Sequence, residues 1–239
     1  MELGCSTILY GGQDLTVAIQ RIAAAGYRAV ELCAIPGMAP HLKTGENNSY
    51  FTGVKNLVAD HNLVIESIGA SGSLSNQDLF LRILDSAAEI GAPLITTGSG
   101  GESDKEESFK SFVNTINSLV DEASTRGVKI SIKPHVKSAV YNTSTAQRFM
   151  KEVDRNWVGI NYDPTHIWRT PQKEIPEDTV GEILDYILSA RIRDVTGRQL
   201  AIGSVEGQIA GNGDLNLPAL SQELKKAPSL NYVILEIVG

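Results

Sequence analysis

The sequence predicts a single α/β domain, a (β/α)8 TIM barrel spanning residues 1–239. Short apolar or β-branched runs alternate with longer amphipathic runs from one end of the chain to the other, as in repeated β-α units. Several of the short runs are almost continuously apolar, which is typical of parallel strands buried on both faces. Eight such units in a chain of this length favour a closed barrel, which usually needs about 250 residues. No linker, low-complexity tract or charge block indicates a second domain.

The short runs give the expected strands and the amphipathic runs give the expected helices. The strands are predicted at residues 3–7, 29–33, 63–69, 93–97, 128–133, 157–162, 191–195 and 232–238. The intervening helices are predicted at residues 15–25, 49–60, 76–90, 106–126, 143–153, 180–189 and 218–226. Asp14 is expected to cap the first helix, and Gly26, Gly91 and Gly127 are expected to end three of them.

The pattern lacks the final C-terminal helix of a complete barrel. The chain stops at Gly239, directly after the last predicted strand. We therefore expect either a truncated chain or a homo-oligomer in which a partner subunit covers the bare wall.

Composition narrows the classes of partner. The formal net charge is −7 and no run of Lys or Arg stands out, which argues against nucleic-acid binding. No stretch approaches the ~18 apolar residues of a membrane span, and the N-terminus has no basic segment of a secretory signal. Cys5 and Cys33 lie in apolar runs without CxxC spacing, so neither a disulfide nor a zinc knuckle is expected. These features favour a cytoplasmic protein.

The candidate site residues lie in or just after four of the predicted strands, because the active site of a (β/α)8 barrel is built at the C-terminal strand ends. They are Lys133, His135, Asp163, His166, Arg191, Arg193 and Glu236. Side chains alternate along a strand, so Lys133 and His135 should face the same way, as should Arg191 and Arg193. Buried charges are costly unless they are paired. The cations and carboxylates therefore form either a structural ion-pair cluster or a polar pocket for a polyhydroxylated substrate.

Two further residues are candidates for substrate binding. Glu66 lies within the third predicted strand, where it is either paired in the core or part of the site. Gln208 lies in the Gly-rich segment 196–212, whose length is typical of a lid over a barrel mouth.

Five segments, in order along the chain, resemble the xylose-isomerase-like TIM-barrel family. They are Gly26–Leu32, Gly159–His166, Arg191–Asp194, Gly211–Asn216 and Val233–Glu236. That family includes sugar-phosphate isomerases, keto-sugar 3-epimerases, inosose dehydratases and barrel endonucleases. The resemblance implies a barrel that acts on a small polyhydroxy carbonyl compound.

The resemblance also implies a divalent metal ion held by Glu, Asp, His and Glu, and here the chain departs from the family. Asp163 and Glu236 match two of these ligands, whereas Lys133 and Arg191 replace the other two. A protonated amine or guanidinium has no lone pair for a metal. We therefore expect no metal cofactor. A divalent ion such as Mn or Mg would need an alternative set made of His135, Asp163, His166 and Glu236.

Our hypothesis is that Lys133, together with Arg191, takes over the electrostatic role of the metal and polarises a substrate oxygen. Glu236 would then be the general base, near the carboxylate of Asp163, and His135 or His166 would orient a hydroxyl or shuttle a proton. In the alternative reading, a desolvated Lys133 acts as a base or a Schiff-base nucleophile.

Three functions compete at this point. The first is an isomerase, epimerase or lyase acting by proton transfer on a sugar-like small molecule, and the second is a non-catalytic sugar-binding or regulatory barrel. The third, cleavage of DNA at abasic sites, is disfavoured by an acidic chain with four His. The net charge and the absence of a clear basic cradle favour an uncharged substrate.

Overall fold

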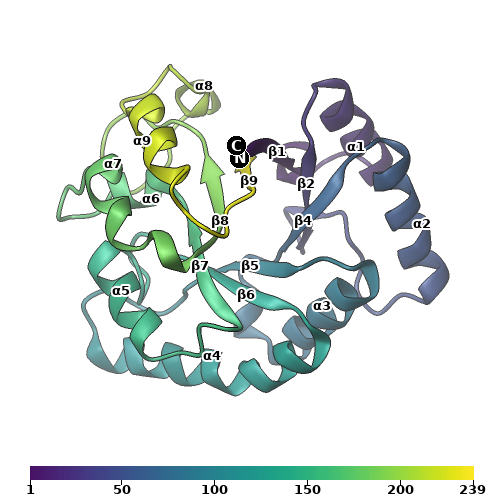
Figure 1. Ribbon diagram of the computed structural model, residues 1–239, viewed down its shortest axis with the longest axis horizontal. Coiled ribbons are helices and arrows are strands. Elements are labelled where there is room, and N and C mark those ends of the chain that lie inside the picture. Colours follow the sequence, from purple (N-terminus) through teal and green to yellow (C-terminus); the bar gives the residue numbers. More distant parts are fainter.

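The computed structural model describes residues 1–239 and shows a closed parallel β-barrel surrounded by helices (Figure 1). The barrel strands are β1 (Glu2–Ser6), β2 (Ala29–Ile35), β4 (Val64–Gly69), β5 (Leu94–Gly98), β6 (Lys129–Lys133), β7 (Val158–Tyr162), β8 (Ile187–Ile192) and β9 (Tyr232–Leu235). Each pairs in parallel with its neighbour, and β1 pairs with both β9 and β2, which closes the ring. The predicted TIM barrel is confirmed.

Most of the predicted helices are present within a few residues of their expected bounds. The longer helices are α1 (Leu15–Ala24), α2 (Asn48–Asp60), α3 (Gln77–Ile90), α4 (Glu106–Arg126), α5 (Thr143–Lys151) and α9 (Leu217–Leu224). Gly91 and Gly127 end α3 and α4 in the left-handed conformation, as expected from their sequence positions. Asp14 stands at the N-cap of α1, but its side chain makes no capping hydrogen bond.

The helix predicted at 180–189 is wrong. The one-turn helix α7 (Pro176–Thr179) ends just before this region. The region itself contains two 3-10 turns, η3 (Val180–Glu182) and η4 (Leu184–Tyr186), and the start of β8. Strand β8 begins at Ile187 instead of residue 191, because pairing with β7 captures the apolar residues that mimicked helical spacing.

Short elements that the sequence pattern did not predict decorate the barrel. The 3-10 turns η1 (Thr7–Tyr10) and η2 (Ser73–Ser75) follow β1 and β4, and the two-residue β3 (Ala39–Pro40) pairs antiparallel with β2. Helix α6 (Pro164–Trp168) starts directly after β7, with Asp163 as its N-cap and Pro164 in its first turn. The predicted lid segment contains α8 (Val205–Gln208).

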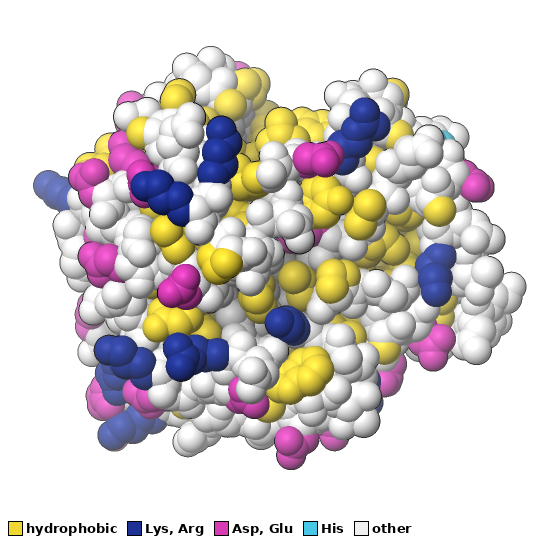
Figure 2. Space-filling view, in the orientation of Figure 1, with side chains coloured by type: hydrophobic (Ala, Val, Ile, Leu, Met, Phe, Trp, Pro, Cys, Tyr) yellow, Lys and Arg dark blue, Asp and Glu magenta, His cyan; other side chains and the backbone are white.

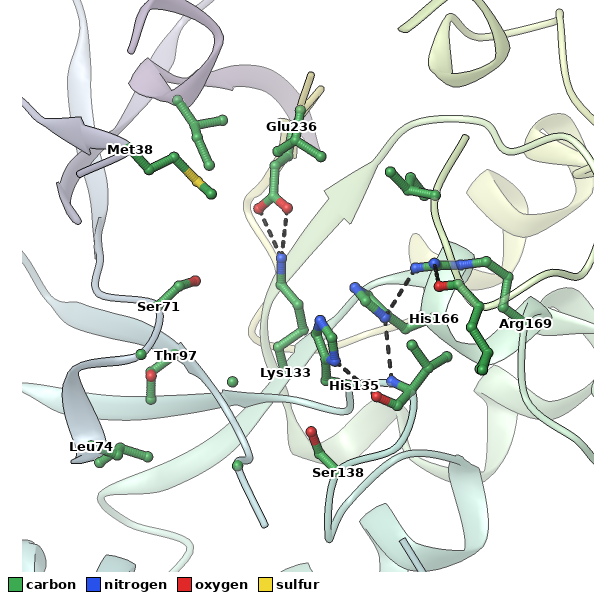
Figure 3. A pocket seen from close by; sticks show the side chains of 18 of the residues that line it. Met38, Ser71, Leu74, Thr97, Lys133, His135, Ser138, His166, Arg169 and Glu236 are labelled. Atoms are coloured by element: carbon green, nitrogen blue, oxygen red, sulfur yellow. Dashed lines mark hydrogen bonds and ion pairs between the residues drawn. The ribbon is translucent and has the colours of Figure 1, made fainter. Parts of the chain in front are cut away.

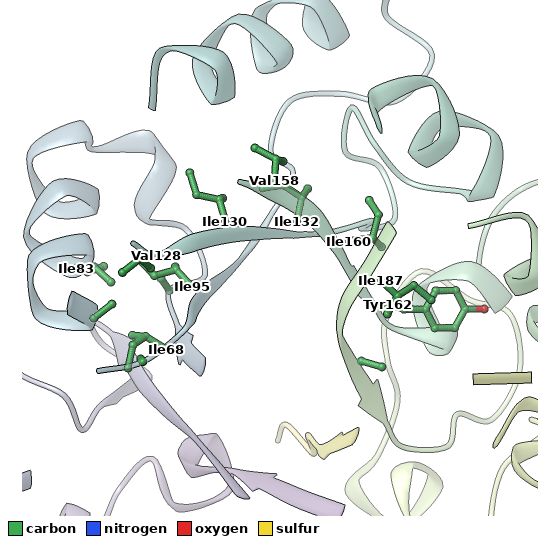
Figure 4. Close-up of a cluster of buried hydrophobic side chains, with 14 of the residues drawn as sticks. Ile68, Ile83, Ile95, Val128, Ile130, Ile132, Val158, Ile160, Tyr162 and Ile187 are labelled. Atoms are coloured by element: carbon green, nitrogen blue, oxygen red, sulfur yellow. The ribbon is translucent and has the colours of Figure 1, made fainter. Parts of the chain in front are cut away.

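Along β6, the apolar residues face the helices and the polar residues face the barrel interior. Ile130 and Ile132 of β6 belong to the main hydrophobic core (Figure 4), whereas Ser131 and Lys133 alternate with them and point to the opposite side. Polar side chains of this strand therefore line the barrel interior. The apolar side chains between the strands and the helices pack into the main hydrophobic core.

The surface and the cysteines add little chemistry. No helix is both long and apolar enough to cross a membrane. On the face drawn in Figure 2, basic and acidic side chains are interspersed, without a continuous basic area. Cys5 and Cys33 are free and buried.

A substitution at Gly4 should test how tightly the barrel closes. An added Cβ at this position would lie 2.5 Å from Ile234 Cδ1 and 2.8 Å from the carbonyl oxygen of Ala29, so Gly4→Ala overpacks the interior. We expect a loss of about 1–3 kcal/mol in the free energy of unfolding, measured by denaturant titration. Gly53→Ala is the matched control: it lies exposed in α2 with open space around it, and it should be neutral or stabilising by up to about 1 kcal/mol. Equal stabilities of the two variants would contradict this account.

Candidate functional site

A cavity of about 610 Å³ opens at the C-terminal ends of the strands (Figure 3). Its apolar wall includes Met38, Leu74, Leu200 and Ile202. Its charged and histidine side chains are Lys133, His135, His166, Arg169, Arg193 and Glu236. Five of the nine candidate residues therefore line one cavity: Lys133, His135, His166, Arg193 and Glu236.

Lys133, the last residue of β6, lies between two carboxylates. Its Nζ is 2.8 Å from both carboxylate oxygens of Glu236 and 3.6 Å from Oδ2 of Asp163. Lys133 is 7% exposed and Asp163 is 1% exposed, so the contacts are largely shielded from water. The Lys133 ammonium group thus bridges the two carboxylates that follow β7 and β9.

Arg193 is a second cation bound to the same two carboxylates. It follows β8, and its Nη2 lies 2.9 Å from Oδ2 of Asp163, while its Nη1 lies 3.5 Å from Oε1 of Glu236. Burial by itself would raise the pKa of Glu236, but the charges of Lys133, Arg193 and Arg191 outweigh it and lower that pKa to about 2. Against the same burial penalty, Arg193 above all holds the pKa of Asp163 well below its ordinary value. Both carboxylates are therefore held ionised.

Arg191 supports this layer from beneath and does not line the cavity. It is fully buried and forms an ion pair with Glu31, and its Nε donates to Oε2 of Glu236 at 3.1 Å. Further donors of its guanidinium bond to Ser189 at 2.8 Å and to Thr96 at 3.0 Å. Of the two cations expected to act as a pair, Lys133 reaches the cavity and Arg191 lies in the barrel interior.

The two histidines stack side by side, with their ring centroids 4.0 Å apart. Nδ1 of His135 lies 3.0 Å from the carbonyl oxygen of Val136, so it carries the proton, and Nε2 keeps a free lone pair. Nδ1 of His166 accepts from Arg169 at 3.1 Å and from the Val136 amide at 3.4 Å, so in the neutral ring the proton is on Nε2. Burial lowers the pKa of both rings, which favours their neutral forms.

Helix α6 explains how three of these groups come together. Asp163, His166 and Arg169 are spaced at three-residue intervals, so they fall on one face of this short helix and its caps. Nε2 of His166 is 3.8 Å from Oδ2 of Asp163, and Nη2 of Arg169 donates to His166.

Glu66 and Gln208 lie away from the cavity. Glu66 accepts hydrogen bonds from Ser67 at 2.5 Å and from Ser189 at 2.7 Å inside the barrel, and it borders a depression at the opposite, N-terminal end. Burial raises its pKa. Gln208 is fully buried and binds both the amide and the carbonyl of Val238, at 3.0 and 2.6 Å. It fixes the C-terminal segment, whose Val238 lines the cavity.

A small polar recess continues below the cavity. Its volume is about 10 Å³, enough for about one water molecule or hydroxyl group, and Thr97 and Asn161 border it. Both amide atoms of Asn161 and the hydroxyl of Thr97 are buried without a hydrogen-bond partner. Unpaired buried polar groups of this kind indicate a place for a polar guest.

Arg169 is the wall residue that sequence reasoning missed, because its position depends on the short helix α6. Arg193 was among the candidates, since it lies two residues beyond Arg191 and so shares its direction, but it was given no role. The structure places Arg193 just after β8, in the wall of the cavity.

The donor set does not fit a divalent metal ion. No group of three or more His, Cys, Asp or Glu side chains in the chain is arranged to hold one. The oxygens of Asp163 and Glu236 are already bound by Lys133 and Arg193, which would repel a second cation at that point.

The free energy of unfolding at acidic pH should depend on the ionisation of Glu236. Its pKa in the folded state, about 2, is below the ordinary 4.5, so its stabilising contribution is present above 4.5 and is lost as the pH falls towards 2. The native protein and Glu236→Gln should therefore differ less in free energy of unfolding at pH 2 than at pH 4.5, by on the order of 3 kcal/mol. Denaturant unfolding at a series of pH values measures it. A gap that stays constant across the window would contradict the ion-pair account.

Comparisons with known proteins agree with this architecture. A family model described as the xylose isomerase-like TIM barrel matches residues 19–239. A search of curated protein sequences found no match.

Among solved structures, the probable 3-DHS dehydratase AsbF from Bacillus anthracis, described as involved in petrobactin synthesis, aligns with TM-score 0.82 and 18% identity, over 100% of this chain and 93% of its own. The IolI protein with a bound zinc atom aligns with TM-score 0.78 and 18% identity over 99% and 89%. A D-psicose 3-epimerase studied in the presence of D-fructose aligns with TM-score 0.78 and 15% identity over 99% and 85%. At these identities the structural likeness shows the fold alone, but the family model covers most of the sequence. The chain belongs to the xylose isomerase-like TIM-barrel family.

Proposed function

We propose that this protein is a sugar isomerase/epimerase-like enzyme that moves a proton on a small polyhydroxy carbonyl compound, with Lys133 in place of a divalent ion. The observation that carries the proposal is the position of the Lys133 ammonium, 2.8 Å from both oxygens of Glu236 and 3.6 Å from Asp163. The family resemblance assigns Asp163 and Glu236 to a divalent metal ion. In our proposal the ammonium group of Lys133 takes the place of that ion.

Lys133 retains a donor for a substrate oxygen. An ammonium has three N–H groups, and two of them are directed to Glu236. The third is free to donate to a carbonyl oxygen in the cavity, and it would stabilise the negative charge that develops there when a proton leaves the adjacent carbon. The contacts with Glu236 and Asp163 attract a positive charge at this position, which favours this role over that of a base or Schiff-base nucleophile.

His135 is the best-placed general base. Its Nε2 lone pair is free, its Nδ1 proton is held by Val136, and its lowered pKa keeps it neutral near pH 7. Glu236, the base expected from sequence, is a weaker candidate because its oxygens are bound by cations and its pKa is about 2. In our proposal Glu236 and Asp163 position Lys133, and His166 steadies the stacked ring of His135.

The reaction step is a proton transfer with balanced charge. His135 takes the proton from a carbon next to the substrate carbonyl, the C–H electron pair forms a C=C bond, and the carbonyl oxygen becomes an enolate held by Lys133. Protonation of the opposite face of the same carbon by solvent, while His135 releases its proton to solvent, gives epimerisation. Delivery of the His135 proton to the former carbonyl carbon, with a hydroxyl proton moving to oxygen, gives isomerisation. Departure of a β-hydroxyl as water, with the His135 proton taken up by the leaving oxygen, gives dehydration.

The relatives support this reaction class, since one aligned structure is a D-psicose 3-epimerase and another is a probable dehydratase. The competing function is a non-catalytic sugar-binding or regulatory barrel. Neutralisation of both strand-end carboxylates by cations is the observation that favours it.

Proton exchange with solvent separates the two functions. We expect the native protein to exchange a substrate C–H for deuterium in D2O when it is incubated with a panel of ketoses and cyclic polyhydroxy ketones, observed by NMR, and to do so equally well in the presence of a chelator. His135→Asn should lower the exchange rate about 10²–10⁴-fold. Lys133→Met should lower it about 10²–10³-fold.

His61→Asn is the matched control, because His61 lies at the end of α2 and its side chain bonds only to the Leu57 carbonyl. It should leave exchange unchanged. Saturable binding of a sugar without exchange at any carbon would instead favour the non-catalytic barrel.

A second prediction concerns the metal directly. The double variant Lys133→Glu/Arg191→His supplies the ligand types that the family uses, so it should bind Mn²⁺, measured by titration calorimetry and by metal content after dialysis. Lys133→Met removes the cation without adding a ligand and should bind far less. Circular dichroism checks that both variants remain folded. If the folded double variant does not bind Mn²⁺, the hypothesis that Lys133 replaces the metal ion is contradicted.

A further inference from the structure

Arg169 is a buried cation without an acidic partner. It is 3% exposed and lines the cavity, and no carboxylate lies within salt-bridge distance. Its three hydrogen bonds go to neutral acceptors: the carbonyl of Thr165 at 2.8 Å, the carbonyl of Leu200 at 2.5 Å and Nδ1 of His166 at 3.1 Å. A guanidinium has five N–H groups, so two remain free. A buried charge in this state is costly unless an anion joins it.

Arg193 also has an unused donor on the same cavity. It is 2% exposed, and its Nη2 is bound to Asp163. Its Nη1 lies 3.5 Å from Oε1 of Glu236 but makes no hydrogen bond. A buried unpaired donor at a cavity wall indicates that the missing acceptor belongs to a ligand.

One cation of the cavity wall has no carboxylate contact. Lys133 and Arg193 pair with Asp163 and Glu236, and Arg191 pairs below them with Glu31. Arg169 has no such partner. One unpartnered cation matches a monoanion better than a phosphate dianion, because Glu236 in the same wall would repel a second negative charge.

We infer that the ligand of this cavity carries a carboxylate, which binds to Arg169 and to Nη1 of Arg193 while its polyhydroxylated part reaches Lys133 and His135. This inference rests on the proposed function and deepens it: the substrate class is a polyhydroxy acid or keto acid. It replaces the uncharged substrate expected from the net charge of the whole chain. The apolar residues Leu200 and Ile202 line the same cavity and would strengthen the pairing by excluding water.

Equilibrium binding of matched ligands tests the inference. Gluconate, galactonate and threonate are compared with sorbitol, galactitol and threitol, which have the same carbon count and no carboxylate. Calorimetry and ligand-observed NMR give the dissociation constants. The native protein should bind at least one acid about 10-fold or more tightly than its polyol, and added salt should weaken the acid alone. Equal or weaker binding of every acid overturns the inference.

Variants locate the carboxylate. Arg193→Gln and Arg169→Gln should each reduce the preference for the acid to about 3-fold or less, with little change in polyol binding. Arg169→Lys keeps the charge, and it should recover part of the preference if the Gln variant unfolds. Arg82→Gln, at an exposed position on α3, is the matched control and should keep the full preference. A preference for the acid that survives in folded forms of both Gln variants overturns the assignment.

The binding experiment and the exchange experiment fail separately. Selective binding of an acid without proton exchange would sustain the carboxylate site and overturn the proposed enzyme. Exchange on uncharged ketoses, without any preference for acids, would sustain the enzyme and overturn the carboxylate site.

Discussion

The contact on which the site depends is the one between the Lys133 ammonium and two buried carboxylates, Glu236 and Asp163. These two anions follow β7 and β9, on either side of β8. They repel each other and lose hydration when they are buried, so they need a cation between them. A lysine can supply that cation permanently because it is covalently part of β6. The cavity wall is then set in place by folding, without the need to capture an ion from solution.

Two further cations, Arg191 and Arg193, hold the carboxylates of Glu236 and Asp163 in position. Arg191, fully buried beneath, joins Glu31 to Glu236, and Arg193 joins Asp163 to Glu236. This stack requires a polar barrel interior, which the alternation of strand side chains provides while the apolar faces pack on the helices. The chemistry of the cavity and the stability of the barrel end therefore share the same ion pairs.

The agreement between sequence and structure was uneven for physical reasons. Helix α4 matched its predicted bounds because its apolar residues keep helical spacing over many turns and Gly127 ends it. The prediction of a helix at 180–189 was wrong because the few apolar residues there fit both helical and strand spacing. Pairing with β7 places the end of this region in a strand. The segment 196–212 indicated a lid, but whether Gln208 reaches a ligand depended on the course of the C-terminal segment, which Gln208 binds instead.

The sequence by itself determined the alternation of β and α units and the polar residues at the strand ends, among them Lys133 and Arg191. Those features are local, since they follow from residue type, spacing and the direction of side chains along a strand. Only the tertiary structure decided that Lys133 lies between Glu236 and Asp163, that Arg191 sits one layer below, and that Arg169 has no acidic partner. Those features depend on which strand ends and helix caps converge at the barrel mouth, and pairing energies between distant segments set that convergence.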